Sequence, residues 1–481
     1  MNSNSSRMRH MISHHSVHLS NPRRRLMMAL VTSLCLFIGM AANVALAQDA
    51  GEDLAETTLW TALQDRPAQS QRAGASSDTQ AGSTEAEKPS HLAIVGGTVH
   101  TVTGPVLHNA TILITDGKIT DIGPRVTIPD SADVVDAAGY RVYPGIVSIR
   151  PGNVRGNEPA EDTSDVYSIN TVMALAGGVT TVVASNSAAK VTFGTLDDMT
   201  IRRGLFESIR WTSNDPQGKR RLRESFDRLQ AYIRDLEAYE ERRRRDPSAT
   251  APDNRWIRGE FERNLRLLRG EAVALMDANT THELLQICEL ANQYGLRIVV
   301  RGAREGWLVA PELARAGIAC IVTPRTRSDR DQRYNRPNGS SIENAAILHQ
   351  HGVPVAIVPS NTSIGFGGLA GRDLLHIAME AAFGVRGGLS NAEAIRAITI
   401  QPARMMGIDH RVGSIEVGKD ADLIITDGEL LHYATHVRWA FVNGRLAYDK
   451  MQESLLDHIR PDDPDAQPAQ DYWPRRLGEA W

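Results

Sequence analysis

Apolar positions divide the chain into two β-rich ends and a middle part in which strands and helices alternate. In residues 91–145, short apolar runs joined by turns are typical of a small all-β unit. Residues 409–450 return to this pattern and include a hairpin around Asn443-Gly444. Between them, residues 146–408 alternate strand-like apolar runs with helical segments, which predicts a parallel sheet in an α/β fold. The strand-like runs of this middle part are 179–183, 272–276, 296–300, 318–322 and 353–358.

A charged insertion at residues 219–269 interrupts this alternation. It is helical in composition and contains four consecutive arginines at 242–245, directly after Glu240-Glu241. An arginine run is one signature of nucleic-acid binding, but interleaved acidic residues are typical of a solvated helix with Glu–Arg pairs. The net charge of -4 gives no general attraction to nucleic acid or to an anionic membrane surface. We therefore expect a solvated helix and no nucleic-acid partner.

The N-terminus, residues 1–47, has the three-part pattern of a secretory signal peptide. Three arginines at 23–25 precede an apolar run at 26–40, and Ala45-Leu46-Ala47 fits a small-x-small cleavage site. Because the run is short for a membrane span, we expect a secreted or periplasmic protein with no stable membrane insertion. An uncleaved anchor is the alternative. Two polar segments, 48–90 and 451–481, are predicted to be a disordered linker and a loose C-terminal tail.

Composition adds two limits to this picture. The chain has 481 residues, 42% of them hydrophobic, which is enough for a large core. A barrel of about 250 residues counts as a single domain. Of the 3 cysteines, Cys35 lies in the signal segment, whereas Cys288 and Cys320 stand in apolar runs far apart in sequence. These two are predicted to be buried thiols and not a disulfide.

Four motifs in the chain resemble the amidohydrolase superfamily. The segment Val142-Tyr143-Pro144-Gly145-Ile146-Val147 matches the apolar-Pro-Gly-apolar frame that opens the family's first barrel strand. Residues 411–425 match its closing Gly-Ser-apolar-Glu-x-Gly-Lys-Asp-Ala-Asp signature. Gly177-Gly178-Val179-Thr180-Thr181 and residues 397–404 resemble two further phrases that recur in the family.

This resemblance implies both a fold and a chemistry. The fold is a (β/α)8 TIM-like barrel over residues 146–408, with a composite β-sandwich domain formed by residues 91–145 and 409–450. The chemistry is hydrolysis of carbon–nitrogen bonds other than peptide bonds, in cyclic or linear amides. In the family, one or two divalent metals lower the pKa of a bound water and polarise the scissile bond.

The metal ligands of the family are not matched where the resemblance places them. An Asp-x-His-x-His segment follows the Pro-Gly frame in the family, and here Ser148, Arg150 and Gly152 stand at those positions. A cation at Arg150 would repel a metal, and metal capture needs several convergent His or carboxylate ligands. We therefore expect no metal site and no other cofactor, although zinc or another divalent metal is the family norm. The remaining ligand positions align with Asp277, Asn279, Gly302, Ile201 and Ser360 or Asn361, while Lys190 is close to the bridging-lysine position but out of register.

Polar side chains at the predicted strand ends form the candidate site, because barrel active sites lie at the C-terminal edge of the strands. Asp277 and Glu305 are the candidates for a general base. The arginines either bind an anion or carboxylate bidentately, or pair with these two carboxylates and fill the space that metals would occupy. The candidates for substrate binding are Arg150, Asn279, Arg301, Arg325 and Asn361.

Two functions stay open at this point. The first is a divergent hydrolase that works without the usual metal, with Asp277 or Glu305 as base and an arginine as oxyanion stabiliser. The second is a catalytically inactive pseudoenzyme that acts as a ligand-binding protein or as the partner subunit of an active paralogue. In both cases the ligand is a small molecule, and the resemblance also points to a homo-oligomer.

Overall fold

The computed structural model describes residues 90–156, 159–212, 214–364 and 373–452. The predicted signal peptide, nearly all of the predicted linker and most of the predicted C-terminal tail lie outside these residues. No helix in the described ranges combines the length and the apolar character that crossing a membrane requires.

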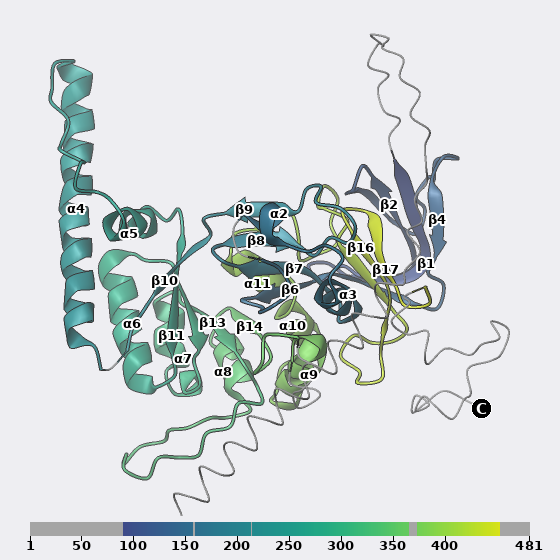
Figure 1. Ribbon diagram of the computed structural model, residues 1–481. Coiled ribbons are helices and arrows are strands. Elements are labelled where there is room, and N and C mark those ends of the chain that lie inside the picture. Colours follow the sequence, from purple (N-terminus) through teal and green to yellow (C-terminus); the bar gives the residue numbers. More distant parts are fainter. Residues whose placement is uncertain (1–89, 157–158, 213, 365–372, 453–481) are drawn as a thin grey trace, which may run out of the picture. The chain divides into compact units, whose positions relative to one another are not determined.

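The two ends of the chain build one eight-stranded sheet, in which strands from the N-terminal and C-terminal parts lie side by side (Figure 1). Its order is β17-β16-β15-β5-β1-β2-β3, and β4 pairs with β1. The seam between the two halves is the antiparallel β5–β15 pair, in which Tyr143 is opposite Ile424. The strands are β1 (His91–His100), β2 (Val106–Thr115), β3 (Lys118–Gly123), β4 (Asp133–Asp136), β5 (Arg141–Pro144), β15 (Leu423–Thr426), β16 (Val437–Val442) and β17 (Arg445–Asp449).

Two tight hairpin turns pack against each other within this sheet. Asp116-Gly117 and Asn443-Gly444 all have positive φ, as a two-residue type I′ turn requires. A Cβ on Gly117 would come within 2.7 Å of the Asn443 carbonyl oxygen, so this close approach needs glycine. The two Asx-Gly signals in the sequence thus mark the places where the halves of the sheet meet.

Seven parallel strands in the described residues form the barrel region. β6 pairs with β7, and β10 to β14 follow one another in order. The hairpin strands β8 and β9 stand between β7 and β10, where Asn186 links the two sheets because its carbonyl oxygen accepts from the amides of Gly204 and Leu205. At the other side, a parallel bridge joins Gly152 to Ser363 beyond the ends of β6 and β14. The strands are β6 (Ile146–Ile149), β7 (Val179–Ala184), β8 (Ser187–Lys190), β9 (Thr200–Arg203), β10 (Phe206–Ile209), β11 (Val273–Ala278), β12 (Ile298–Gly302), β13 (Ala319–Val322) and β14 (Val355–Ile357).

Alternating residues of these strands face two separate apolar clusters, as strands with both faces covered must. Leu275 and Val299 belong to a cluster inside the barrel, closed at its base by Met405 and Met406. Their neighbour Met276 belongs to the larger cluster between strands and helices. The α/β barrel fold with a composite β-domain, predicted from the sequence, is confirmed.

Helices cover the outside of the barrel strands, and one long helix forms most of the charged insertion (Figure 1). This helix, α4 (Pro216–Arg245), is capped by Asp215 and has its buried residues, such as Phe226 and Leu229, in its first half. Cys288 and Cys320 are free and buried, as predicted. The other helices are α2 (Ala160–Thr163), α3 (Ile169–Ala176), α5 (Glu260–Leu268), α6 (Thr281–Tyr294), α7 (Ala310–Arg315), α8 (Asn344–Gln350), α9 (Ile377–Arg386), α10 (Asn391–Arg396) and α11 (Ile400–Met405), with short 3-10 turns η1 (Gly306–Leu308) and η2 (Leu374–His376).

Candidate functional site

An ion pair lies at the C-terminal ends of β11 and β12, on the inner face of the barrel. Asp277 and Arg301 are direct neighbours in the parallel register, and they continue the face that carries Leu275 and Val299. Arg301 donates from Nε to Oδ1 at 2.6 Å and from Nη2 to Oδ2 at 2.8 Å. The Asp277 side chain is 58% exposed and that of Arg301 is 35% exposed. The pair therefore sits over the apolar interior and is within reach of solutes.

Arg150 brings a second guanidinium to the same place. It follows β6 with a positive φ of 55°, and its amide donates to the Val183 carbonyl oxygen at 2.6 Å. Burial lowers the pKa of Arg150, the charge of Arg301 lowers it further, and Asp277 opposes both effects. Arg150, Asp277 and Arg301 thus form one cluster, called here the mouth triad. It contains two cations and one anion, since arginine stays protonated in proteins.

The loops beyond β6 and β14 hold this region together. Asn153 exchanges two hydrogen bonds with the Ile364 backbone, at 2.7 and 2.9 Å. A Cβ on Gly152 would collide with the Ser363 hydroxyl, so the second histidine position of the family motif has no room for a side chain. Asn361, a predicted substrate-binding residue, uses its Oδ1 to accept from the Ser363 amide at 3.0 Å and thereby shapes this loop.

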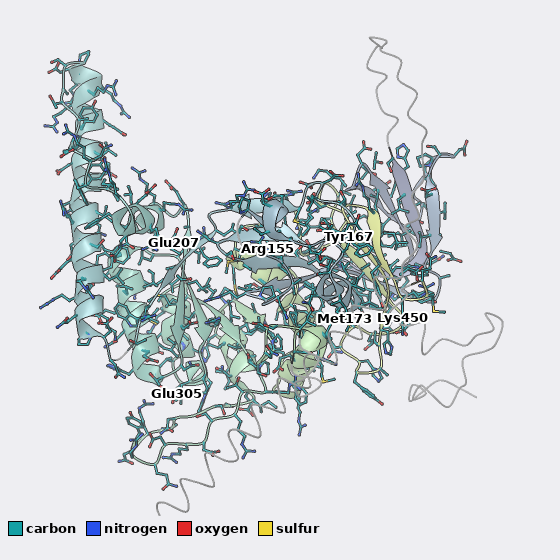
Figure 2. The ribbon with its side chains drawn as sticks, in the orientation of Figure 1. Arg155, Tyr167, Met173, Glu207, Glu305 and Lys450 are labelled. Atoms are coloured by element: carbon teal, nitrogen blue, oxygen red, sulfur yellow. The ribbon has the colours of Figure 1, made fainter. Side chains whose placement is uncertain are left out.

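Glu305, one of the two predicted general bases, is held by several hydrogen bonds. Its carboxylate is almost fully buried beside the loop between β13 and α8 (Figure 2). It accepts from the Thr281 amide and hydroxyl, both at 2.8 Å, and from the Gly339 amide at 3.1 Å, with Arg336 at 3.5 Å. Burial raises the pKa of Glu305, but these hydrogen bonds and Arg336 lower it by more, so the pKa lies below its usual value. Such a carboxylate is a weak base, and its contacts fasten a loop to the start of α6.

Asn279 and Arg325 are also engaged in structural contacts. A Cβ on Gly302, where the family has a histidine, would lie 2.5 Å from Asn279 Oδ1, so the two positions cannot both carry side chains as they stand. Arg325 donates from Nε to Glu380 at 2.7 Å and from its backbone amide at 2.8 Å, and it stacks over the ring of Phe383. Of the predicted substrate-binding residues, Arg150 and Arg301 lie with Asp277, while Arg325 ties the end of β13 to α9.

The donor set at the barrel mouth does not fit a divalent metal. No three His, Cys, Asp or Glu side chains within the described ranges come together as metal ligands. Ser148, at the first family position, is buried with its hydroxyl unpartnered, and both oxygens of Asp277 are engaged by Arg301. We therefore derive no chemical step through a metal.

Sequence reasoning missed one buried charge cluster, centred on Lys190. Its Nζ lies 2.7 Å from Asp420 Oδ2 and 3.3 Å from Asp422 Oδ1, and it also bonds to Asn443 Oδ1. Lys190 is at the end of β8, and the two aspartates belong to the closing motif at residues 411–425. The cluster connects the barrel hairpin to the composite sheet. The sequence signal that could have indicated this cluster is a lysine at the end of the short strand Ser187–Lys190, because a buried lysine needs a charged partner.

Comparison with known proteins agrees with this architecture. The model of the amidohydrolase family matches residues 224–453. A 5-methylthioadenosine/S-adenosylhomocysteine deaminase of Symbiobacterium thermophilum is 26% identical over 403 residues, covering 71% of this chain and 86% of that protein. A dihydroorotase of Mycobacterium tuberculosis is 37% identical over 73 residues, which are 15% of this chain and only 16% of that enzyme.

A solved structure supports the same fold. The amidohydrolase of Thermotoga maritima superposes with a TM-score of 0.58 at 21% sequence identity, covering 75% of this chain and 100% of that one. The barrel strands, the sheet built from both chain ends and the family match point to one conclusion. The chain belongs to the amidohydrolase superfamily, as its four motifs predict.

Proposed function

We propose that this chain is a member of the amidohydrolase superfamily that binds a small organic anion at the barrel mouth and does not carry out metal-assisted hydrolysis. The observation that carries the proposal is the mouth triad, in which Arg301 pairs with Asp277 and the charges of both residues act on Arg150. One positive charge is left uncompensated in a partly desolvated place. A carboxylate ligand supplies the missing counter-charge.

The geometry leaves Arg150 available for this task. Its guanidinium makes no hydrogen bond within the described part of the chain, whereas Arg301 already uses one edge on Asp277. A guanidinium matches a carboxylate through two parallel N–H donors. Beneath the triad, Ile149 and Leu275 belong to the buried apolar cluster inside the barrel, so the triad stands over a surrounding of low polarity.

The test uses N-acetylglycine as the probe, because it combines a carboxylate with an amide bond. Isothermal titration calorimetry of the full chain is expected to give one saturable site. Arg150→Gln should weaken binding about tenfold or more, as expected for loss of a charge-assisted bidentate contact. The matched control is Arg125→Gln, an exposed arginine on the β3–β4 connection. Equal affinity for the neutral N-acetylglycinamide, or equal effects of the two substitutions, would contradict the proposal.

A second candidate function is metal-independent hydrolysis of a carbon–nitrogen bond, with Asp277 as general base. The specific support is the exposure of Asp277, which lets water reach its carboxylate. Its ion pair with Arg301 opposes this role, since both carboxylate oxygens already accept hydrogen bonds from the guanidinium. Release of acetate from N-acetylglycine by the wild-type chain, abolished in Asp277→Asn, would establish the hydrolase. Release that persists in the variant would exclude Asp277 as the base.

The setting of this activity is also a proposal. We infer an exported, secreted or periplasmic protein from the signal pattern at residues 1–47, supported by the three arginines and the small-x-small site. A homo-oligomer or a complex with an active paralogue is consistent with a non-catalytic binding role. Fractionation of the source cells tests the first point, and mass measurement of the native particle tests the second.

A further inference from the structure

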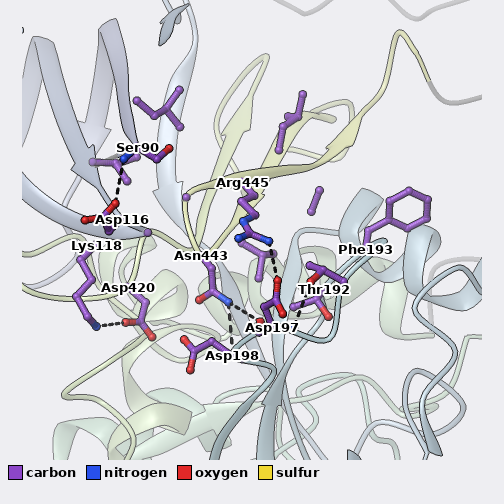
Figure 3. A pocket seen from close by; sticks show the side chains of 18 residues that line it. Ser90, Asp116, Lys118, Thr192, Phe193, Asp197, Asp198, Asp420, Asn443 and Arg445 are labelled. Atoms are coloured by element: carbon purple, nitrogen blue, oxygen red, sulfur yellow. Dashed lines mark hydrogen bonds and ion pairs between the residues drawn. The ribbon is translucent and has the colours of Figure 1, made fainter. Parts of the chain in front are cut away.

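A cavity of about 510 Å³ lies where the composite sheet meets the segment that follows β8 (Figure 3). It is lined by the start of β1, the β2–β3 turn, residues 192–198, Asp420, and the turn between β16 and β17. None of the three mouth residues takes part. The cavity therefore calls for an explanation of its own.

Carboxylates outnumber cations in its lining. Asp116, Asp197, Asp198 and Asp420 face Lys118 and Arg445, and other charges lie behind the wall. Asp420 is fully engaged, with Lys118, Lys190 and Arg411 each 2.7 Å away. Asp197 pairs with Arg445 at 3.0 Å (Figure 3).

Asp116 differs from the other carboxylates of the cavity. Its Oδ1 accepts from the Ser90 amide at 3.0 Å, and it has no cationic partner in the described part of the chain. Asp198 keeps an exposed carboxylate, although it pairs with Arg411. Lys118, Lys190, Arg411 and Arg445 pair with the other three lining aspartates, so Asp116 is the lining carboxylate that no cation of the described residues compensates.

A buried hydroxyl and an apolar wall give a second, independent indication of a ligand. Thr192 is only 3% exposed, and its Oγ1 has no hydrogen-bond partner although the residue lines the cavity. A buried hydroxyl normally has a hydrogen-bond partner, so Thr192 Oγ1 is a candidate contact for a ligand in the cavity. Beside it, half-buried Phe193 and exposed Leu446 provide apolar surface, and Tyr167 supports the Phe193 ring edge-on at 5.7 Å.

We propose that this cavity binds a small organic cation, an amine with an apolar portion. Its ammonium group pairs with the carboxylate of Asp116, and its hydrocarbon part packs on Phe193 and Leu446. An aromatic ring beside carboxylates suits an ammonium through both charge pairing and cation–π attraction. Charge separates the two sites of this chain, since the mouth triad has an arginine without its own carboxylate and this cavity has an aspartate without a cation.

The experiment uses phenethylamine as the probe and 3-phenylpropionate as its counterpart of the same shape and opposite charge. Calorimetry on the full chain is expected to show one saturable site for the amine in the millimolar range and none for the carboxylate. Asp116→Asn should weaken amine binding about tenfold, the effect of a lost charge contact. Thr192→Val, which removes only the hydroxyl, should weaken it severalfold. The matched control, Asp133→Asn on exposed β4, should leave it unchanged.

Three outcomes would overturn the proposal. They are the absence of saturable amine binding, comparable binding of 3-phenylpropionate, and equal effects of Asp116→Asn and Asp133→Asn. Thermal midpoints measured on every variant confirm that the chain is folded, so a loss of binding cannot come from unfolding. Because N-acetylglycine binding depends on the other site, it should persist in the cavity variants.

Discussion

Replacing Lys190 by methionine tests the energetics of the buried charge cluster. The lysine side chain is 0% exposed, and its partners Asp420 and Asp422 are each only 2% exposed. Methionine keeps the length of the side chain and its apolar stem, and it removes the ammonium group. The variant leaves two carboxylates buried close together, with Asp420 still paired to Lys118 and Arg411, and Asp422 without a cation.

The expected loss is large because the uncompensated charge remains in the folded state. Breaking a buried ion pair by removing one partner costs about 3–5 kcal/mol. The matched control is Arg245→Met, which breaks an exposed helical pair with Glu241 in α4. Such surface pairs contribute about 0–1 kcal/mol, so the control should hardly change the midpoint of unfolding.

The dependence on pH supplies a second readout with a definite sign. Burial raises the pKa of Asp422, and Lys190 opposes this rise. Without the lysine the folded-state pKa is higher still, so the folded state binds a proton more readily than the unfolded chain. Stability is then present at low pH and is lost as pH rises through the raised pKa. The deficit of Lys190→Met should therefore shrink as pH falls from about 8 to about 5.

Urea unfolding followed by circular dichroism measures both effects. Each variant is compared with the wild type at the two pH values, using midpoints and slopes. A deficit below about 1 kcal/mol at neutral pH would show that the cluster is not desolvated as described. A deficit that grows as pH falls would refute the assignment of the lost stability to buried carboxylates.

Three further substitutions have defined outcomes. Glu305→Gln should destabilise the chain by about 1–3 kcal/mol at pH 7, because backbone donors lose an ionised acceptor. The pKa of Glu305 is lower in the folded state than in the unfolded chain, so its ionised carboxylate stabilises the fold at pH values above the unfolded pKa. This stabilisation is lost as pH falls through the folded pKa. The urea midpoints of the variant and the wild type should therefore converge in acid. Gly152→Ala should lower the free energy of unfolding by about 1–3 kcal/mol, because the new Cβ collides with the Ser363 hydroxyl. Adding Ser363→Ala should restore part of the urea midpoint. A double variant with the same midpoint as Gly152→Ala would contradict this contact. Arg325→Met removes the cationic partner of Glu380, whose side chain is 1% exposed, and should lower the free energy of unfolding by about 3–5 kcal/mol. The affinity for N-acetylglycine should not change. A loss of binding would show that Arg325 belongs to the ligand site.

Much of the fold was predictable because local signals determine it. The Pro-Gly frame at 144–145 and the closing motif at 411–425 place the two chain ends in one sheet, and the Asx-Gly pairs mark its tight turns. Residues 91–145 were predicted to be a small all-β unit from their short apolar runs and turns, and they form strands β1 to β5. Strand periodicity and turn chemistry act over a few residues, so the sequence displays them directly.

The site was only partly predictable because its chemistry depends on register and long-range packing. Asp277 and Arg301 were both assigned to strand ends, but their direct pairing needs the β11–β12 register. Glu305 was predicted as a general base from its position at a strand end, and nothing local reveals its bond to Gly339, 34 residues away. Asp422 and Asn443, two partners of Lys190, are more than 200 residues away in the sequence. Contacts of this kind leave no periodic trace in the sequence.

The central claim is that the barrel mouth is an arginine site for an anion and not a metal centre. The most direct measurement is the zinc and manganese content of the wild-type chain and of Asp277→Asn, after dialysis with both metals, by elemental mass spectrometry. Because both Asp277 oxygens are engaged by Arg301 beside Arg150, the two proteins should retain equal and substoichiometric metal. Nearly one metal per chain in the wild type, lost in Asp277→Asn, would contradict the claim.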